Sequence, residues 1–113
     1  MEEKNHYFIS KTSIYDYAMV LHLCDSNRSD KTVFVKVTNN EKIGIYLTDT
    51  PEGRKEMQDF QNLWISSDSP YRETSFHQII MSIKVQDKML EVIKTIADAT
   101  GLLTEEIKEI LQP

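Results

Sequence analysis

Residues 32–48 read TVFVKVTNNEKIGIYLT, and this stretch decides the fold. Every second residue from Val33 to Val37 is a valine, which is the two-residue period of a strand with one buried face. The same alternation returns in residues 43–48, after the short polar connection of residues 39–42. Two alternating segments this close together predict an antiparallel hairpin with one face turned toward the core.

The segment before the hairpin, residues 15–24, fits two patterns. Tyr17, Met19 and Leu21 alternate as in a strand, but the same region also fits one face of a helix, which Ser13 and Asp16 would cap. This pattern alone does not decide between a strand and a helix. The turn-rich loop that follows favours the first of them, a third strand in a meander that begins at about Tyr17.

A helix is predicted directly after the hairpin. Thr50 can cap it, Pro51 suits its first position because no N–H is needed there, and the pattern continues to about Trp64. Gly53 makes this helix start a weak one. The apolar stripe of this helix consists of Met57, Phe60, Leu63 and Trp64.

The last third of the chain, residues 76–111, has helical periodicity almost throughout. Ser75 and Gln78 have the spacing of a capping pair, although the isoleucine-rich residues 76–85 also fit a strand. Asp87 can cap a further helix that ends at Gly101, and a last helix begins at Thr104. Together these elements predict a single α+β domain over residues 1–113, in which an antiparallel sheet of about three strands is packed by a central helix and a C-terminal helical hairpin.

Composition narrows the classes of function. Thirteen basic and eighteen acidic side chains give a net charge of -5, which disfavours binding to phosphate backbones and to anionic lipid. The single cysteine, Cys24, forms no disulfide framework within the chain, so we expect a reducing compartment and place the protein in the cytoplasm. The longest apolar run, Ala18–Leu21, is far shorter than the ~20 residues of a membrane span, and we expect no contact with membrane.

Residues 93–111 form the most specific local motif. Ile96 and Ala97 are followed by Gly101 and later by Ile107, an arrangement typical of two helices joined by a tight turn. This segment resembles the Ile-Ala-x-x-Thr-Gly-Leu-x-x-x-x-Ile pattern of DNA-binding regulators, and it is similar to the C-terminal tails of transposase-related nucleases. The resemblance implies a helix-turn-helix-like corner. Its second helix is acidic, with one lysine against three glutamates, so nucleic-acid binding is the alternative hypothesis rather than the leading one.

Groups that could support catalysis are few and scattered. His6, His22 and His77 lie in separate segments without the spacing of metal ligands, and the three glycines are isolated, so no phosphate-binding loop is present. We predict no metal and no cofactor. A small enzyme that uses Cys24 with His22 is the second alternative to the leading hypothesis.

The leading hypothesis is a small acidic interaction protein without enzymatic activity, such as an adaptor, an inhibitor or immunity-type factor, or an assembly chaperone. Its partner is another protein or a second copy of the chain. Phe34 and Tyr46 lie on the second face of the hairpin, where they either sit under a helix or form a binding patch, and Tyr71 in a polar loop is another anchor. The candidate partner-binding residues are Phe34, Tyr46, Tyr71, Ile107, Ile110 and Leu111.

Overall fold

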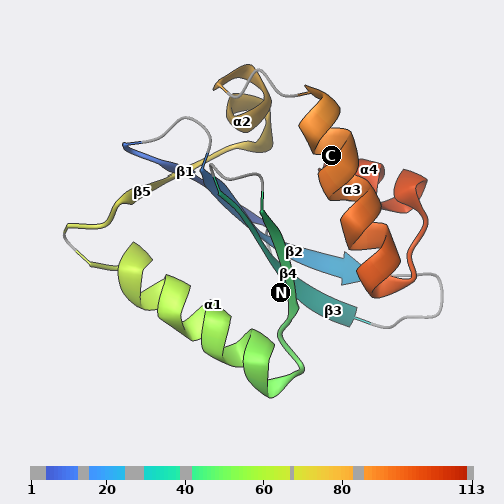
Figure 1. The fold of residues 1–113 in the computed structure, drawn as a ribbon, viewed down its shortest axis with the longest axis horizontal. Helices are drawn as coiled ribbons and strands as arrows, with labels where there is room; N and C mark the ends of the chain where they lie inside the picture. The colour runs from blue at the N-terminus through green and yellow to red at the C-terminus, as the bar shows by residue number, and fades with distance from the viewer. Residues whose placement is uncertain are drawn as a thin grey trace.

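The computed structural model describes residues 5–12, 16–24, 30–38, 42–66, 68–82 and 86–111. Its fold is α+β, with one antiparallel sheet between two layers of helices (Figure 1). In chain order the elements are β1 (His6–Ser10), β2 (Tyr17–Cys24), β3 (Asp30–Val37), β4 (Ile43–Leu47), α1 (Pro51–Trp64), β5 (Tyr71–Thr74), α2 (Phe76–Ser82), α3 (Gln86–Thr100) and α4 (Thr104–Leu111).

The sheet has five strands in the order β4-β3-β2-β1-β5, so the prediction of about three strands is corrected. The three predicted strands are present as β2, β3 and β4, and the open alternative at residues 17–24 is resolved as a strand. The two additional strands, β1 and β5, lack the alternation of apolar and polar side chains by which strands are predicted from sequence. Tyr7 and Phe8 of β1 point to opposite helical layers, and β5 is a four-residue polar segment that pairs with β1.

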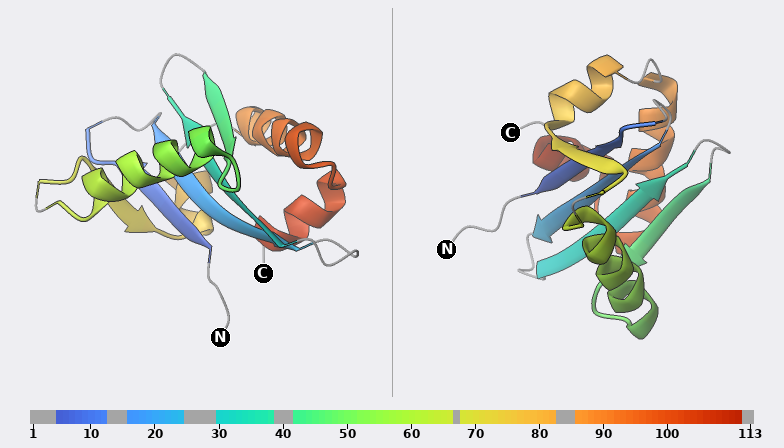
Figure 2. Two further views of the ribbon diagram at one scale, coloured as in Figure 1. Left: turned by 90° about the horizontal axis from the view of Figure 1, so that it is seen from below. Right: turned by 90° about the vertical axis from the view of Figure 1, so that its left-hand side faces the viewer.

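Helix α1 covers one face of the sheet, and α2, α3 and α4 cover the other (Figure 2). The larger core lies between the sheet and these three helices, and it contains the alternating valines of β3 together with Tyr17 of β2. A smaller core lies under α1, where Phe60 packs between Phe8 and Phe34 at ring-centroid distances of 5.1 and 5.0 Å. The sheet is therefore apolar on both faces.

The predicted helix starts and turns are largely confirmed. Thr50 caps α1 by accepting a hydrogen bond from the N–H of Gly53 at 3.0 Å, and Ser75 accepts one from the N–H of Gln78 at 3.2 Å. Residues 76–82 are helical, which excludes the strand alternative for that part. Gly101 has a φ of 79°, the left-handed conformation that the turn between α3 and α4 requires. Helix α3 begins at Gln86, so Asp87 lies inside its first turn and the prediction that Asp87 caps it was wrong.

We expect alkaline pH to destabilise the protein through Tyr17, which is 2% exposed. Burial raises the pKa of Tyr17 from its ordinary value of 10 to about 12. The unfolded chain loses this proton above pH 10, whereas the folded chain retains it up to about pH 12. The contribution of the Tyr17 proton to the free energy of unfolding is therefore complete below pH 10. As the pH rises to 12, this contribution falls by roughly 2 kcal/mol.

Denaturant titrations of the wild type and Tyr17→Phe at pH 9 and pH 12 measure this effect. Phenylalanine preserves the ring but has no proton to lose, so the variant should lose about 2 kcal/mol less over this interval. The other groups that titrate in this range are the same in both proteins and cancel in the comparison. Equal losses in the two proteins would contradict the assignment to Tyr17.

Candidate functional site

The six predicted contact residues lie mostly inside the protein. Phe34 is 0% exposed under α1. Of the two alternatives for this face of the hairpin, a helix cover or a binding patch, the structure therefore shows the helix cover at Phe34. Ile107 and Leu111 are 0% and 1% exposed in the core between α4 and the sheet. In the folded chain these three side chains cannot reach a partner.

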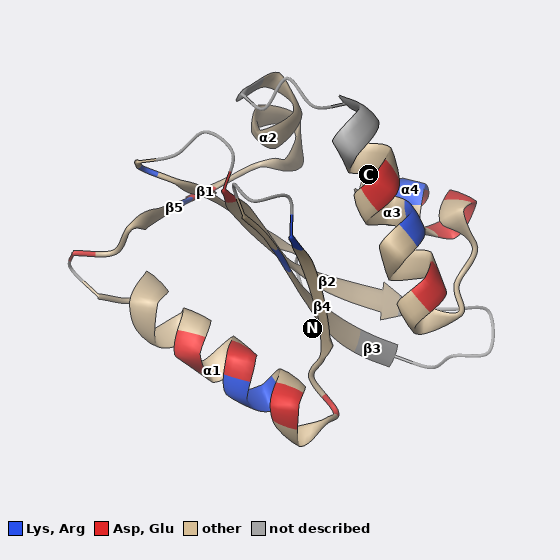
Figure 3. Cartoon of the chain, in the orientation of Figure 1, with Lys and Arg blue, Asp and Glu red and all other residues tan. Residues whose placement is uncertain are grey.

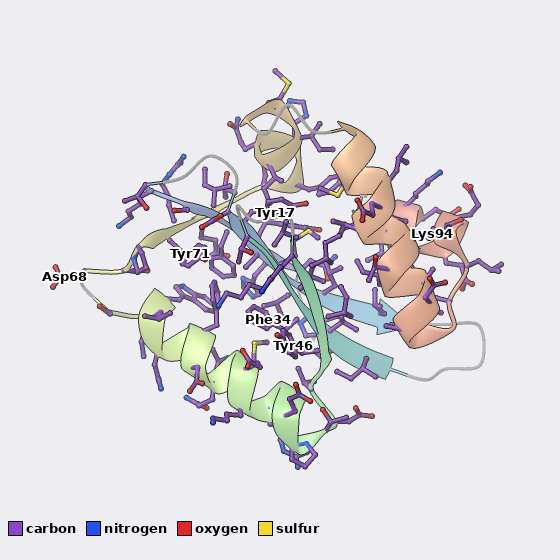
Figure 4. All side chains as sticks on the ribbon, viewed as in Figure 1. Tyr17, Phe34, Tyr46, Asp68, Tyr71 and Lys94 are labelled. Atoms are coloured by element: carbon purple, nitrogen blue, oxygen red, sulfur yellow. The ribbon has the colours of Figure 1, made fainter. Side chains whose placement is uncertain are left out.

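The remaining three predicted residues are half-buried. Tyr46 stacks on Phe34 at a centroid distance of 6.0 Å, and Ile110 packs against the larger core. Tyr71 belongs to β5 rather than to a loop, which corrects the prediction, and its ring meets that of Phe60 edge-on at 5.0 Å. Burial, followed by the charge of Asp16, raises the pKa of Tyr71. Figure 4 shows Phe34, Tyr46 and Tyr71 on the α1 side of the sheet, away from Tyr17.

The helical corner of residues 93–111 is held from within the fold. Thr100 donates its hydroxyl to the carbonyl of Ile96 at 2.7 Å, and Gly101 donates its N–H to the carbonyl of Ala97 at 2.8 Å. In α4, Lys108 lies 3.6 Å from Glu105, so the one basic side chain of this helix is next to a carboxylate. The apolar side of α4 faces the sheet, and its outer side is acidic.

The histidines remain in three separate environments. His6 lies 2.7 Å from the carboxylate of Glu73, His22 lies 3.1 Å from the hydroxyl of Thr32, and His77 is exposed on α2. The side chain of Cys24 is outside the described residues, so its predicted pairing with His22 stays a prediction. Within the described ranges, no group of three or more His, Cys, Asp or Glu side chains is arranged to hold a metal ion.

The two edges of the sheet differ in how they are protected. At β5 the hydroxyl of Ser69 accepts a hydrogen bond from the N–H of Tyr71 at 3.2 Å and donates one to its carbonyl at 3.1 Å. Both backbone groups of Tyr71 are therefore occupied. The next two residues, Arg72 and Glu73, are exposed and charged, and Pro70 precedes the strand. Charges, a proline and a short length are the usual means of preventing an edge strand from pairing.

The other edge, β4, lacks these protections over residues 43–47, which read IGIYL. All five residues are half-buried, and none is charged. The bonds from Thr38 N to Lys42 O and from Thr48 N to Thr32 O identify the residue pairs that bond β4 to β3. Because bonded and non-bonded pairs alternate in an antiparallel ladder, the N–H and C=O groups of Ile43, Ile45 and Leu47 point away from β3.

One of these outward groups is used within the chain. The carbonyl of Leu47 accepts hydrogen bonds from the N–H of Thr50 at 3.1 Å and from its hydroxyl at 2.8 Å. The groups of Ile43 and Ile45 face outward, and no described strand lies beyond β4 in the sheet. Figure 2 shows β4 at the rim of the sheet, between α1 on one side and α3 on the other. We refer to the outward backbone of residues 43–47 as the β4 edge.

Charged residues flank the β4 edge on its α1 side, and their signs are divided along the strand. Burial raises the pKa of Tyr46, and the negative charges of Glu56 and Glu52 raise it further, which places these two carboxylates near the Tyr46 end. Lys36 lies directly opposite Gly44 in the ladder, and Lys42 precedes the strand, so the Gly44 end is basic. Figure 3 shows the acidic segments of α1 and the basic segments of the neighbouring strands.

Exposed apolar side chains occur elsewhere but do not share one element. Leu63 and Ile65 lie at the end of α1, where Leu63 had been predicted to face the core and is instead 45% exposed. Met81 and Leu90 lie on α2 and α3, on the opposite side of the sheet from α1 (Figure 1). None of the described helices combines the length and apolar character needed to cross a membrane.

No protein-family profile, curated protein or solved structure matches this chain.

Proposed function

We propose that this chain is a protein-interaction module that binds an extended polypeptide segment along the β4 edge. The observation that carries the proposal is the contrast between the two edges of the sheet. Ser69 occupies the backbone of Tyr71 at the β5 edge, whereas Ile43 and Ile45 present outward N–H and C=O groups at the β4 edge. Strand addition uses such groups for affinity and uses the alternate side chains for specificity.

The side chains of the β4 edge suit this form of binding. Ile43, Ile45 and Leu47 are half-buried against the larger core, so the apolar surface they leave exposed borders the unpaired backbone. An added strand would cover that surface and satisfy the backbone groups together. The proposal retains the roles of adaptor, inhibitor or assembly chaperone, because all three act through contact with another protein.

The proposal is tested with Ile45→Pro, because proline has no N–H and its ring blocks an approaching strand. The N–H of Ile45 points outward, so the variant should keep the bonds between β4 and β3. The matched control is Ile45→Ala, which also shortens the side chain but retains the N–H. The two variants should differ in unfolding free energy by less than about 1 kcal/mol.

Each protein is immobilised and exposed to native lysate, and the retained proteins are compared by quantitative mass spectrometry. We expect a set of proteins retained equally by the wild type and by Ile45→Ala, and recovered at least about tenfold less by Ile45→Pro, since the hydrogen bond from this N–H, worth about 1 kcal/mol, is lost and the proline ring blocks the approaching strand. Equal recovery by all three proteins, or no specific retention by any of them together with a wild type that stays monomeric, would refute binding at the β4 edge.

A further inference from the structure

We propose that the segment bound at the β4 edge is the β4 strand of a second copy of this chain, paired antiparallel about a two-fold axis at Ile45. This inference rests on the proposed function and names its partner. It joins two five-stranded sheets into one continuous sheet. The argument depends on the direction of the backbone groups and on the division of charge along the edge.

The backbone groups of the β4 edge fit an antiparallel copy of themselves. With Ile45 on the axis, its N–H and C=O pair with those of the second copy's Ile45. Ile43 then lies opposite the second copy's Leu47, whose N–H can reach the Ile43 carbonyl. The N–H of Ile43 points in turn at the second copy's Leu47 carbonyl, which already accepts two hydrogen bonds from Thr50. The N–H and C=O groups of Ile45, the carbonyl of Ile43 and the N–H of Leu47 are thereby paired without a change in β4.

The side chains are compatible with the same arrangement on both faces. Gly44 falls opposite the second copy's Tyr46, and the Tyr46 ring of the same strand lies over Gly44, so the two tyrosine rings meet on this face. On the other face the half-buried Ile43, Ile45 and Leu47 meet the same three residues of the second copy. Cross-strand pairs of β-branched and aromatic residues are the ones that stabilise a sheet.

The charges select an antiparallel second copy. On each copy Glu52 and Glu56 lie near Tyr46, in a part of α1 that also carries Arg54 and Lys55, and Lys36 and Lys42 lie near Gly44 (Figure 3). The two-fold axis places the basic end of one copy beside the acidic end of the other. A parallel arrangement would place like charges together, which opposes association. The β4 edge is therefore complementary to itself in one direction only.

The first test is sedimentation equilibrium of the full chain from about 1 µM to about 1 mM. We expect a reversible dimer for the wild type and for Ile45→Ala, and a monomer for Ile45→Pro. Hydrogen exchange adds a local readout. The amides of Ile45 and Leu47 should become protected as the wild-type concentration rises, whereas the Thr38 amide, bonded within the hairpin, should not change.

The second test reverses the charges in two variants, Lys36→Glu with Lys42→Glu and Glu52→Lys with Glu56→Lys. Each variant alone should dimerise at least roughly thirtyfold more weakly, because four attractive contacts worth about 0.5 kcal/mol each are lost. An equal mixture of the two should restore association as a heterodimer. The control for the first variant, Lys11→Glu with Lys94→Glu, makes the same change of net charge at two exposed positions outside β4 and should associate as the wild type does.

The outcomes separate this inference from the proposed function. A wild-type monomer at all concentrations, together with lysate capture that Ile45→Pro abolishes, overturns the second copy as partner but leaves strand addition in place. A dimer that survives Ile45→Pro overturns the β4 edge as its interface. A dimer that depends on Ile45 but is not restored by mixing the charge-reversed variants overturns the antiparallel alignment.

Discussion

Replacement of Phe60 by alanine should lower the free energy of unfolding by about 4 kcal/mol. The ring is 3% exposed and lies at the centre of the core under α1, with centroids 5.1 Å from Phe8, 5.0 Å from Phe34 and 5.0 Å from Tyr71. Removal of a buried aromatic ring costs roughly 3–5 kcal/mol, because the transfer energy is lost and a cavity remains. Aromatic contacts contribute roughly 0.5–1.5 kcal/mol of their own.

Urea titration monitored by circular dichroism measures the change, and Leu63→Ala is the control. Leu63 lies on the same helix but is 45% exposed, so its truncation should cost less than about 1 kcal/mol. The loss of about 4 kcal/mol expected for Phe60→Ala is a large part of the ~5–15 kcal/mol that stabilises an ordinary domain. A cost below about 1 kcal/mol for Phe60→Ala would show that α1 does not pack on the sheet through this ring.

Replacement of Gly53 by alanine should destabilise the protein by at least about 3 kcal/mol, although alanine is the better helix former. Gly53 is buried in the first turn of α1, directly against the end of β4. A Cβ atom at this position would lie 1.8 Å from the carbonyl oxygen of Leu47 and 2.5 Å from its carbonyl carbon. These are backbone atoms, so the helix would have to move away from the sheet.

The same carbonyl accepts the two hydrogen bonds from Thr50, so displacement of the helix would also disturb the cap of α1. Thermal and urea denaturation of Gly53→Ala measure the effect. The control is Gln58→Ala at an exposed position of the same helix, which should change stability by less than about 0.5 kcal/mol. If Gly53→Ala proved as stable as the wild type, the close approach of α1 to β4 would be wrong.

The sequence predicted the elements whose apolar spacing is long and regular. Strands β3 and β4, the start of α1 at Pro51 and the turn at Gly101 all follow from local patterns, and the structure confirms each of them. It did not predict β1 or β5. Strand β1 is covered on both faces and so shows no alternation, and β5 has one tyrosine and three polar residues, whose strand conformation comes from pairing with β1.

The candidate site was predicted less well than the fold. Aromatic and aliphatic side chains were the basis for choosing Phe34, Ile107 and Leu111, but the same side chains are also what a core requires, and these three are buried. The β4 edge is defined by backbone groups, which every residue carries. The only local sign of it was a run of uncharged residues at 43–47, without the lysine or proline that often protects an edge strand.

The sequence by itself determined the long regular periodicities of this protein, and therefore strands β3 and β4 and the helices, because these patterns depend on neighbours along the chain. Tertiary structure alone decided that β5 joins β1, that Gly53 touches the carbonyl of Leu47, and that β4 has no described strand beyond it. These features arise between segments that are distant in sequence, and the order of strands in a sheet is fixed by packing rather than by the composition of any one strand.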